Sequence, residues 1–173
     1  MKKLVTLGLV AALVPLAAFA FAPKAPPGPA AIEEMLRGLF KAVDSGDREA
    51  VKAAIAKDAK EPVLCWDNDL EGKPVAIKGV EATHKYLDGL MDAITKSSAK
   101  MTSKIGDLHA ACDSPALGYA TFSLTQSMMS AEGKSESATY WVTALVTADK
   151  NDKWHIFHWH SSPAAEAPSG TAK

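Results

Sequence analysis

The sequence has 173 residues, of which 47% are hydrophobic and 23% are charged, a composition typical of one globular domain with tails. Its 19 basic and 20 acidic residues give a net charge of −1 at pH 7, so it lacks the basic footprint of a protein that binds duplex nucleic acid. Cysteine occurs only at Cys65 and Cys112, which excludes a disulfide-dense scaffold.

The first 20 residues have the pattern of a secretory signal peptide. Lys2 and Lys3 precede an uncharged stretch over 4–20 that ends in small residues, and a basic start, an apolar centre and an A-x-A end define such a peptide. An uncleaved anchor is the alternative, although the stretch is borderline in length for a membrane span. We expect cleavage after Ala20 and a periplasmic or secreted protein. The mature chain then has 17 basic and 20 acidic residues, a net charge of −3, and no membrane association.

Short tails flank the expected domain over 32–163. Residues 21–31 are rich in proline, which favours an extended linker. Residues 164–173 are small, polar and interrupted by proline and glycine, a composition typical of a disordered tail.

The first half of the domain has mainly helical periodicity. Apolar residues recur every three or four positions from Ile32 to Val43, which indicates an amphipathic helix. Gly46 can end this helix in a left-handed cap, and Asp47 can cap the next one. The elements expected in this half are a helix over 32–43, a second helix after Asp47, a strand over 62–66, a polar turn over 67–73, a return strand over 74–78 and a helix over 80–94.

The second half changes to the two-residue period of strands. The expected strands cover 104–112, 117–130, 135–148 and 153–161, and polar turns separate them. Such turns join antiparallel neighbours. Helices therefore gather in the N-terminal half and strands in the C-terminal half, which predicts an α+β fold with the helices packed on one face of an antiparallel sheet.

The end of the domain carries a family resemblance. The segments Ser135-Glu136-Ser137-Ala138-Thr139, 142–146 and Asp152-Lys153-Trp154-His155-Ile156-Phe157-His158-Trp159-His160-Ser161-Ser162 resemble the closing hairpin of SnoaL-like proteins. They also resemble the association domain of calcium/calmodulin-dependent protein kinase II. Both belong to the nuclear transport factor 2-like superfamily, which also fits the helical opening. The resemblance implies a cone, formed by a strongly bent sheet and three helices, with a pocket between them.

The resemblance does not select one function, because one fold hosts many activities. It implies an exported module that binds a small molecule or dimerises. It also leaves open an isomerase, dehydratase or cyclase of the SnoaL-like or ketosteroid-isomerase-like type, and an oligomeric assembly scaffold. The kinase association domain has an arginine directly after the last histidine of the motif. This sequence has Ser161 there and no arginine over 140–148, so it lacks those carboxylate-binding groups.

The last strand holds the main candidates for chemistry. Side chains at i and i+2 share a face, which places Trp154, Ile156, His158 and His160 together, opposite His155, Phe157 and Trp159. The resemblance implies that the first set points into the cone. A histidine pair could ligate a metal, but a third ligand such as His84 or Asp67 would have to come from elsewhere. A histidine bonded to a backbone or hydroxyl group is the simpler interpretation, and we expect no resident metal.

The same histidines could work as acids or bases, because histidine titrates near physiological pH. Asp67 could then abstract a proton next to a carbonyl, with His158 or His160 as its catalytic partner, while tyrosines polarise the carbonyl. The alternative is that Asp67 opens a solvated turn and the tyrosines fill core space. The candidate ligand-binding residues are Trp66, His84, Tyr119, Tyr140, Trp154, His158 and His160.

The other motifs in the sequence give less information about function. The acidic turn after Asp67 superficially resembles a calcium loop, but its twelfth position is Lys78 instead of an acidic residue. No Gly-rich phosphate loop or G-x-S-x-G motif is present, and we expect no cofactor.

Two predictions concern association and oxidation. Phe157 and Trp159, expected on the outer face beside the apolar run over 142–146, predict a homodimer formed through the sheet. Export permits a disulfide between Cys65 and Cys112. Both cysteines also lie in or beside apolar segments, where a thiol packs well, so the sequence leaves the disulfide open.

Overall fold

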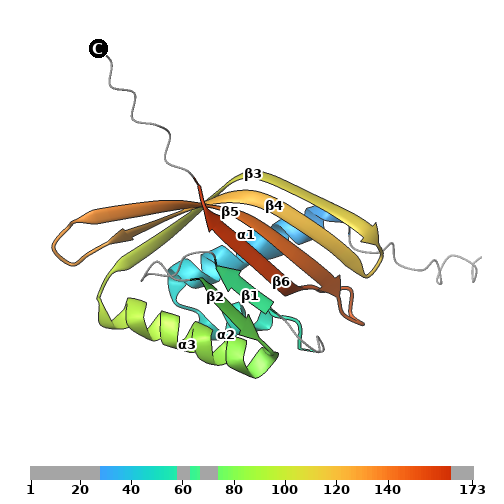
Figure 1. Cartoon of the computed structure of the whole chain (residues 1–173), viewed down its shortest axis with the longest axis horizontal. Coiled ribbons are helices and arrows are strands. Elements are labelled where there is room, and N and C mark those ends of the chain that lie inside the picture. Colours follow the sequence, from blue (N-terminus) through green and yellow to red (C-terminus); the bar gives the residue numbers. More distant parts are fainter. Residues whose placement is uncertain (1–27, 58–62, 67–73, 165–173) are drawn as a thin grey trace, which may run out of the picture.

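The computed structural model describes residues 28–57, 63–66 and 74–164 (Figure 1). The expected signal peptide, most of the linker, the acidic turn and the C-terminal tail after Ala164 lie outside these residues. The elements are α1 (Pro29–Ser45), α2 (Arg48–Ala53), β1 (Val63–Trp66), β2 (Val75–Lys78), α3 (Val80–Lys96), β3 (Lys100–Ser114), β4 (Leu117–Met129), β5 (Ser135–Ala148) and β6 (Trp154–Pro163).

One bent sheet arches over the three helices (Figure 1). Its strand order is β2-β1-β6-β5-β4-β3. The sheet is mixed, because β1 pairs in parallel with β6 while every other pair is antiparallel. The sequence predicted antiparallel pairing throughout. The parallel pair forms because the chain passes through β2, α3 and three long strands before β6 returns beside β1.

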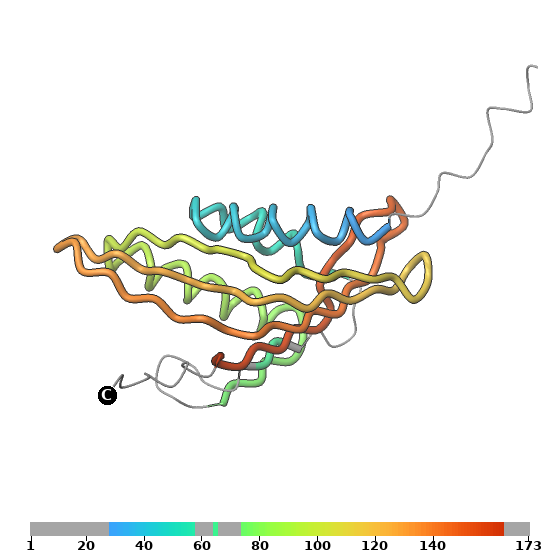
Figure 2. Tube along the Cα trace, turned by 90° about the horizontal axis from the view of Figure 1, so that it is seen from above, coloured from blue at the N-terminus to red at the C-terminus, as the bar shows by residue number. Residues whose placement is uncertain are grey.

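The first helix runs alongside the long strands (Figure 2) and buries the stripe predicted from its periodicity. Ile32 and Leu36 are fully buried, and Phe40 is nearly so. Gly46 ends the helix with a φ of 76°, a conformation that glycine adopts without steric cost. Asp47 then caps α2 by accepting a hydrogen bond from the Ala50 N–H at 3.0 Å. Both local predictions are confirmed.

The third helix is connected to α2 by two ion pairs. Arg48 reaches Asp92, and the Lys52 Nζ lies 2.8 Å from the Asp88 carboxylate. These pairs are partly exposed, so each adds little stability. They connect the two helices at the surface. None of the described helices is both long enough and apolar enough to cross a membrane.

An aromatic cluster joins α1 to the sheet. Phe122 of β4 is 1% exposed and meets Phe40 and Trp159 edge-on, with ring centroids 6.0 and 5.7 Å away. Close packing extends to Gly118, because a Cβ there would lie 2.8 Å from the Ile32 Cδ1. The same Cβ would lie 2.8 Å from the Ala111 carbonyl oxygen of β3, so a larger residue at 118 would disturb the β3–β4 pairing as well as the Ile32 side chain.

A β-bulge in β6 changes which side chains face the helices. Leu145 pairs with His158, but the next residue of β5, Val146, pairs with Ile156. Phe157 is therefore an extra residue, and the alternation shifts by one beyond it.

The inner set on β6 differs from the prediction because of this bulge. Trp154 and Ile156 are buried on the inner face as expected. Beyond the bulge, however, Trp159 and Ser161 are the buried residues, at 8% and 3% exposure. The placement of His158 and His160 inside the cone is wrong, since they alternate with this buried pair.

The two cysteines are not joined in a disulfide. Cys65 lies on β1 and Cys112 on β3, with β6, β5 and β4 between them. Four strand spacings of about 4.8 Å place them about 19 Å apart, whereas a disulfide needs Cα atoms within about 7 Å. The sheet order thus answers the question that the sequence left open.

Candidate functional site

A pocket of about 580 Å³ lies between the sheet and the helices, within the range of small-molecule sites. The inner part of its wall is apolar and comes from five different elements. Its buried members are Phe40, Val51, Ile55, Leu64, Leu124, Ile156 and Trp159. The third helix covers the opposite side with apolar residues, Leu87, Leu90 and Ile94.

The outer part of the wall is mixed, with the apolar Ala93, Met128 and Ala138 beside several polar residues. It is formed by the start of β5, the end of β4 and the end of α3, with Ser97, Gln126, Ser127, Glu136 and Ser137. Among the described lining residues, Glu136 alone carries a charge at pH 7. The pocket therefore combines a mainly apolar interior with a mixed mouth that carries one acidic side chain.

Two lining residues, both on β6, have polar atoms that are buried from solvent. Trp159 and Ser161 both line the pocket. Within the part of the chain that the structure describes, the Trp159 Nε1 and the Ser161 Oγ are buried without a hydrogen-bond partner. The sequence analysis selected neither residue for the site.

The structure places one predicted ligand-binding residue in the pocket wall, Tyr140 of β5. Tyr119 lies on the outer face of the sheet, since it alternates with the buried Gly118 and Ala120, and its ring is 6.3 Å from that of His109.

The other candidates do not line the pocket. Trp154 is buried deeper along β6, and His84 on α3 has a buried Nε2 without a partner among the described residues. His158 and His160 lie on the outer face. The side chain of Trp66 and all of Asp67 lie outside the described residues. The predicted catalytic set of Asp67 with a histidine is thus not brought together by the described part of the fold.

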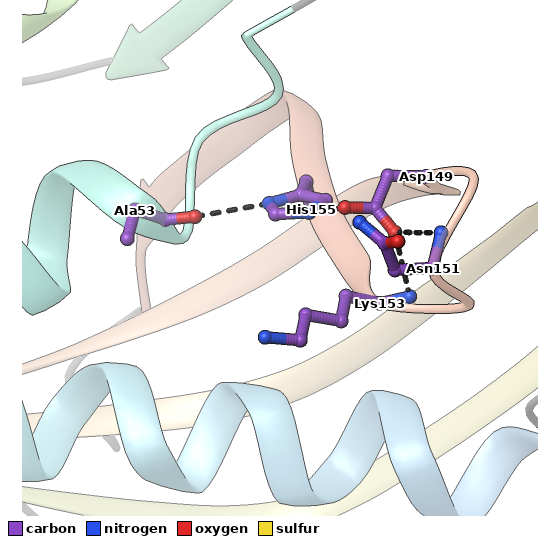
Figure 3. A network of polar contacts seen from close by, with 5 residues as sticks. All are labelled: Ala53, Asp149, Asn151, Lys153 and His155. Atoms are coloured by element: carbon purple, nitrogen blue, oxygen red, sulfur yellow. Dashed lines mark hydrogen bonds and ion pairs between the residues drawn. The ribbon is translucent and has the colours of Figure 1, made fainter.

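A separate polar network holds the turn between β5 and β6 (Figure 3). The His155 ring joins the Ala53 carbonyl oxygen, at 2.9 Å from Nδ1, to the Asp149 carboxylate, at 3.2 Å from Nε2. The Asp149 carboxylate also accepts from the backbone N–H groups of Lys153 and Asn151. These bonds, that of Lys153 first, lower the pKa of Asp149 from 3.8 to about 2.

This network is structural. None of its residues lines the pocket, and its bonds connect the end of α2 to the turn before β6. Across the residues described by the structure, no group of three or more His, Cys, Asp or Glu side chains could hold a metal ion.

Comparison with solved structures identifies the architecture. A nuclear transport factor 2-like protein with a cystatin-like fold from Novosphingobium aromaticivorans superposes with a TM-score of 0.62 at 14% identity, over 80% of this chain and 83% of that one. A CaMKII hub from S. rosetta gives 0.58 at 22% identity, over 80% and 99%. The chain has a nuclear transport factor 2-like fold. The prediction of this fold is confirmed.

The nuclear transport factor 2-like fold does not by itself give a function. A ketosteroid isomerase-like protein from Erwinia carotovora atroseptica also matches, with a TM-score of 0.57 at 17% identity, over 80% of this chain and 97% of that one. No protein-family profile matches the sequence, and no curated protein matches it. Functional inference therefore depends on the residues of this pocket.

The bulge explains why the sequence analysis missed Trp159 and Ser161 in this nuclear transport factor 2-like fold. Strict alternation places both on the outer face, and only the pairing of β6 with β5 reveals the extra residue Phe157. The sequence contains one local signal. Trp159 and Ser161 lie two residues apart, on either side of His160, and side chains with this spacing share one face of a strand.

Proposed function

We propose that the protein is an exported small-molecule-binding protein whose ligand occupies the pocket between α3 and the sheet. The observation that carries the proposal is the pocket itself, with its volume of about 580 Å³ and its buried apolar wall. A largely apolar pocket with a few polar groups is the usual form of a ligand site.

The lining supports binding over acid–base turnover. The described wall contains no imidazole, and its carboxylate, Glu136, lies at the exposed mouth. His158 and His160 alternate with the inward pair Trp159 and Ser161, so neither could reach a molecule in the pocket. Binding needs none of these groups.

A matched pair of variants on α3 tests the binding proposal. Ala93 is exposed and lines the pocket mouth, whereas Ala82 is exposed on the same helix and does not line it. The probe is N-phenyl-1-naphthylamine, a neutral dye that fluoresces in apolar surroundings. We expect A93F to weaken dye binding at least ten-fold and A82F to leave it unchanged.

Two outcomes would contradict the binding proposal. The first is that the dye does not bind the wild-type protein at all. The second is that A93F and A82F bind it equally well, which would place the dye elsewhere. Circular dichroism and a thermal melt of each variant control for loss of the fold.

We also propose that the protein forms a homodimer through the outer face of its sheet. Trp141 on this face is 54% exposed, and Leu145 and Phe157 lie on the same side. An apolar patch shared by neighbouring strands is typical of an interface. Trp159, which the sequence analysis counted in this surface, faces the pocket instead, so Trp141 takes its place.

Light scattering after size exclusion tests the dimer. The wild type should elute as a dimer at micromolar concentration, and W141E should elute as a monomer because a buried carboxylate without a partner is costly. A monomeric wild type would refute the proposal.

Export is tested on the expressed full chain. Mass spectrometry of the protein from the periplasmic or medium fraction should give the mass of a chain that begins at Phe21. An intact N-terminus in the membrane fraction would favour the anchor instead.

A further inference from the structure

The mouth of the pocket carries one carboxylate that no basic side chain neutralises within the described part of the chain. Glu136 is exposed, lines the pocket and enters none of the ion pairs found there. The basic residue of the preceding turn, Lys134, has its Nζ 3.5 Å from the Glu132 carboxylate instead. The described lining contains no lysine, arginine or histidine, so the charge of the mouth is that of Glu136.

The strand register turns Glu136 towards the pocket. Glu136 pairs with Met128 of β4, and the pairing of β4 with β5 continues without a shift to Leu124 and Tyr140. Side chains at even spacing share one face of a strand. Glu136 therefore lies on the inner face of β5 together with Tyr140, which lines the pocket, and Val142, which is buried.

The described lysines near this end of the fold have other positions. The pKa of Asp92 is lowered first by its hydrogen bond to Arg48 and also by Lys96, which places Lys96 beside Asp92. On β3, Lys100 alternates with the pocket residue Met101 and therefore lies on the outer face of the sheet.

The last turn of α3 adds negative potential at the same place. The C-terminus of a helix carries a partial negative charge, because its last carbonyl groups have no partners within the helix. The helix ends at Lys96, and Ser97 after it lines the pocket. Ser97 and Glu136 also line a neighbouring hollow of about 380 Å³, so the helix end and the carboxylate meet at one mouth.

The spacing along β5 sets the shape of a molecule that uses both ends of the pocket. Tyr140 pairs with the buried Leu124 of the apolar wall, and Glu136 lies four residues nearer the mouth. An antiparallel strand rises about 3.4 Å per residue, which separates these two levels by about 14 Å. A molecule that contacts both therefore needs an apolar part and a polar part about this far apart.

We propose that the ligand is an elongated cationic amphiphile, whose apolar part fills the interior and whose ammonium group lies between Glu136 and the end of α3. This inference rests on the proposed function, because it names the class of molecule that the pocket binds. Burial of the apolar part supplies most of the affinity. The exposed charge pair adds a small increment, which selects cations over neutral and anionic molecules of the same shape.

The experiment compares three probes with the same ten-carbon chain: decyltrimethylammonium, the neutral dimethyldecylphosphine oxide, and decanoate. Calorimetry and displacement of N-phenyl-1-naphthylamine, both below micelle-forming concentrations, give the dissociation constants. The wild type should bind decyltrimethylammonium most tightly and decanoate least tightly. The preference for the cation over the phosphine oxide should shrink when salt rises from about 0.05 M to about 0.5 M, because mobile ions screen exposed charges.

Glu81 provides the matched control. It is an exposed glutamate on α3 that does not line the pocket, so E81Q and E136Q remove the same charge from different places. We expect E136Q to reduce the preference for decyltrimethylammonium over the phosphine oxide about three-fold, the effect of one exposed charge pair, and E81Q to leave it unchanged. E136K should bind decanoate more tightly than decyltrimethylammonium.

The outcomes separate the inference from the proposed function. If the three probes bind, A93F blocks them all, and E136Q changes the preference no more than E81Q does, then the pocket binds ligands but the cation inference is wrong. If neither the dye nor any probe binds the wild type, the proposed function itself fails. A wild type that prefers decanoate to decyltrimethylammonium overturns the inference without any variant.

Discussion

Replacing Phe122 by alanine should remove a large part of the stability of the fold. The ring is 1% exposed and meets Phe40 and Trp159 edge-on. A buried Phe→Ala change costs about 3–5 kcal/mol in total, and the two edge-on ring pairs that are lost, each worth about 0.5–1.5 kcal/mol, place this change in the upper half of that range. We therefore expect F122A to lower the free energy of unfolding by about 4–5 kcal/mol, out of a total of about 5–15 kcal/mol for a domain.

Urea denaturation followed by circular dichroism measures this loss, and Met129 provides the control. Met129 lies on the same strand, β4, but is 45% exposed, so M129A should cost under about 1 kcal/mol. Equal midpoints for F122A and M129A would refute the placement of Phe122 at the centre of the core.

Three other predictions concern backbone packing, charge and oxidation. G118A should lower stability by about 1–3 kcal/mol in urea, because its Cβ would lie 2.8 Å from a carbonyl oxygen of β3 and from a side chain of α1; an unchanged midpoint would contradict this packing. The pKa of Asp149 is about 2 in the folded protein, below its ordinary 3.8. The stability that the Asp149 carboxylate gives to the folded protein is therefore present above pH 4 and is lost as the pH falls towards 2. In melts at several pH values, wild type and D149A should converge over that interval, and a constant difference would contradict it. Two thiols, those of Cys65 and Cys112, should react with Ellman's reagent in the denatured, unreduced protein; none would indicate a bridge.

The sequence predicted those parts of the fold whose signals are local. The helical stripe from Ile32 to Phe40, the cap at Asp47 and the helix over 80–94 depend on spacing and on residue types within one segment. Each was found within a few residues of its predicted bounds. The four C-terminal strands were predicted for the same reason, since their two-residue period and their turns are encoded within each hairpin.

The errors arose where two distant segments decide the outcome. The bulge at Phe157 depends on how β6 pairs with β5, and the parallel pairing of β1 with β6 depends on the whole chain between them. A one-residue shift moves every following side chain to the opposite face. This shift alone exchanged the expected His158 and His160 for Trp159 and Ser161 in the inner set.

The most direct test of the central claim is to observe the tryptophan indoles while a ligand binds. In a ¹⁵N-tryptophan-labelled protein, each indole N–H gives its own cross-peak in a two-dimensional NMR spectrum, and single Trp→Phe variants assign them. Titration with N-phenyl-1-naphthylamine should shift the cross-peak of Trp159 and leave those of Trp141 and Trp154 in place. A shift of Trp141 with Trp159 unchanged would put the ligand on the outer face of the sheet and contradict the account.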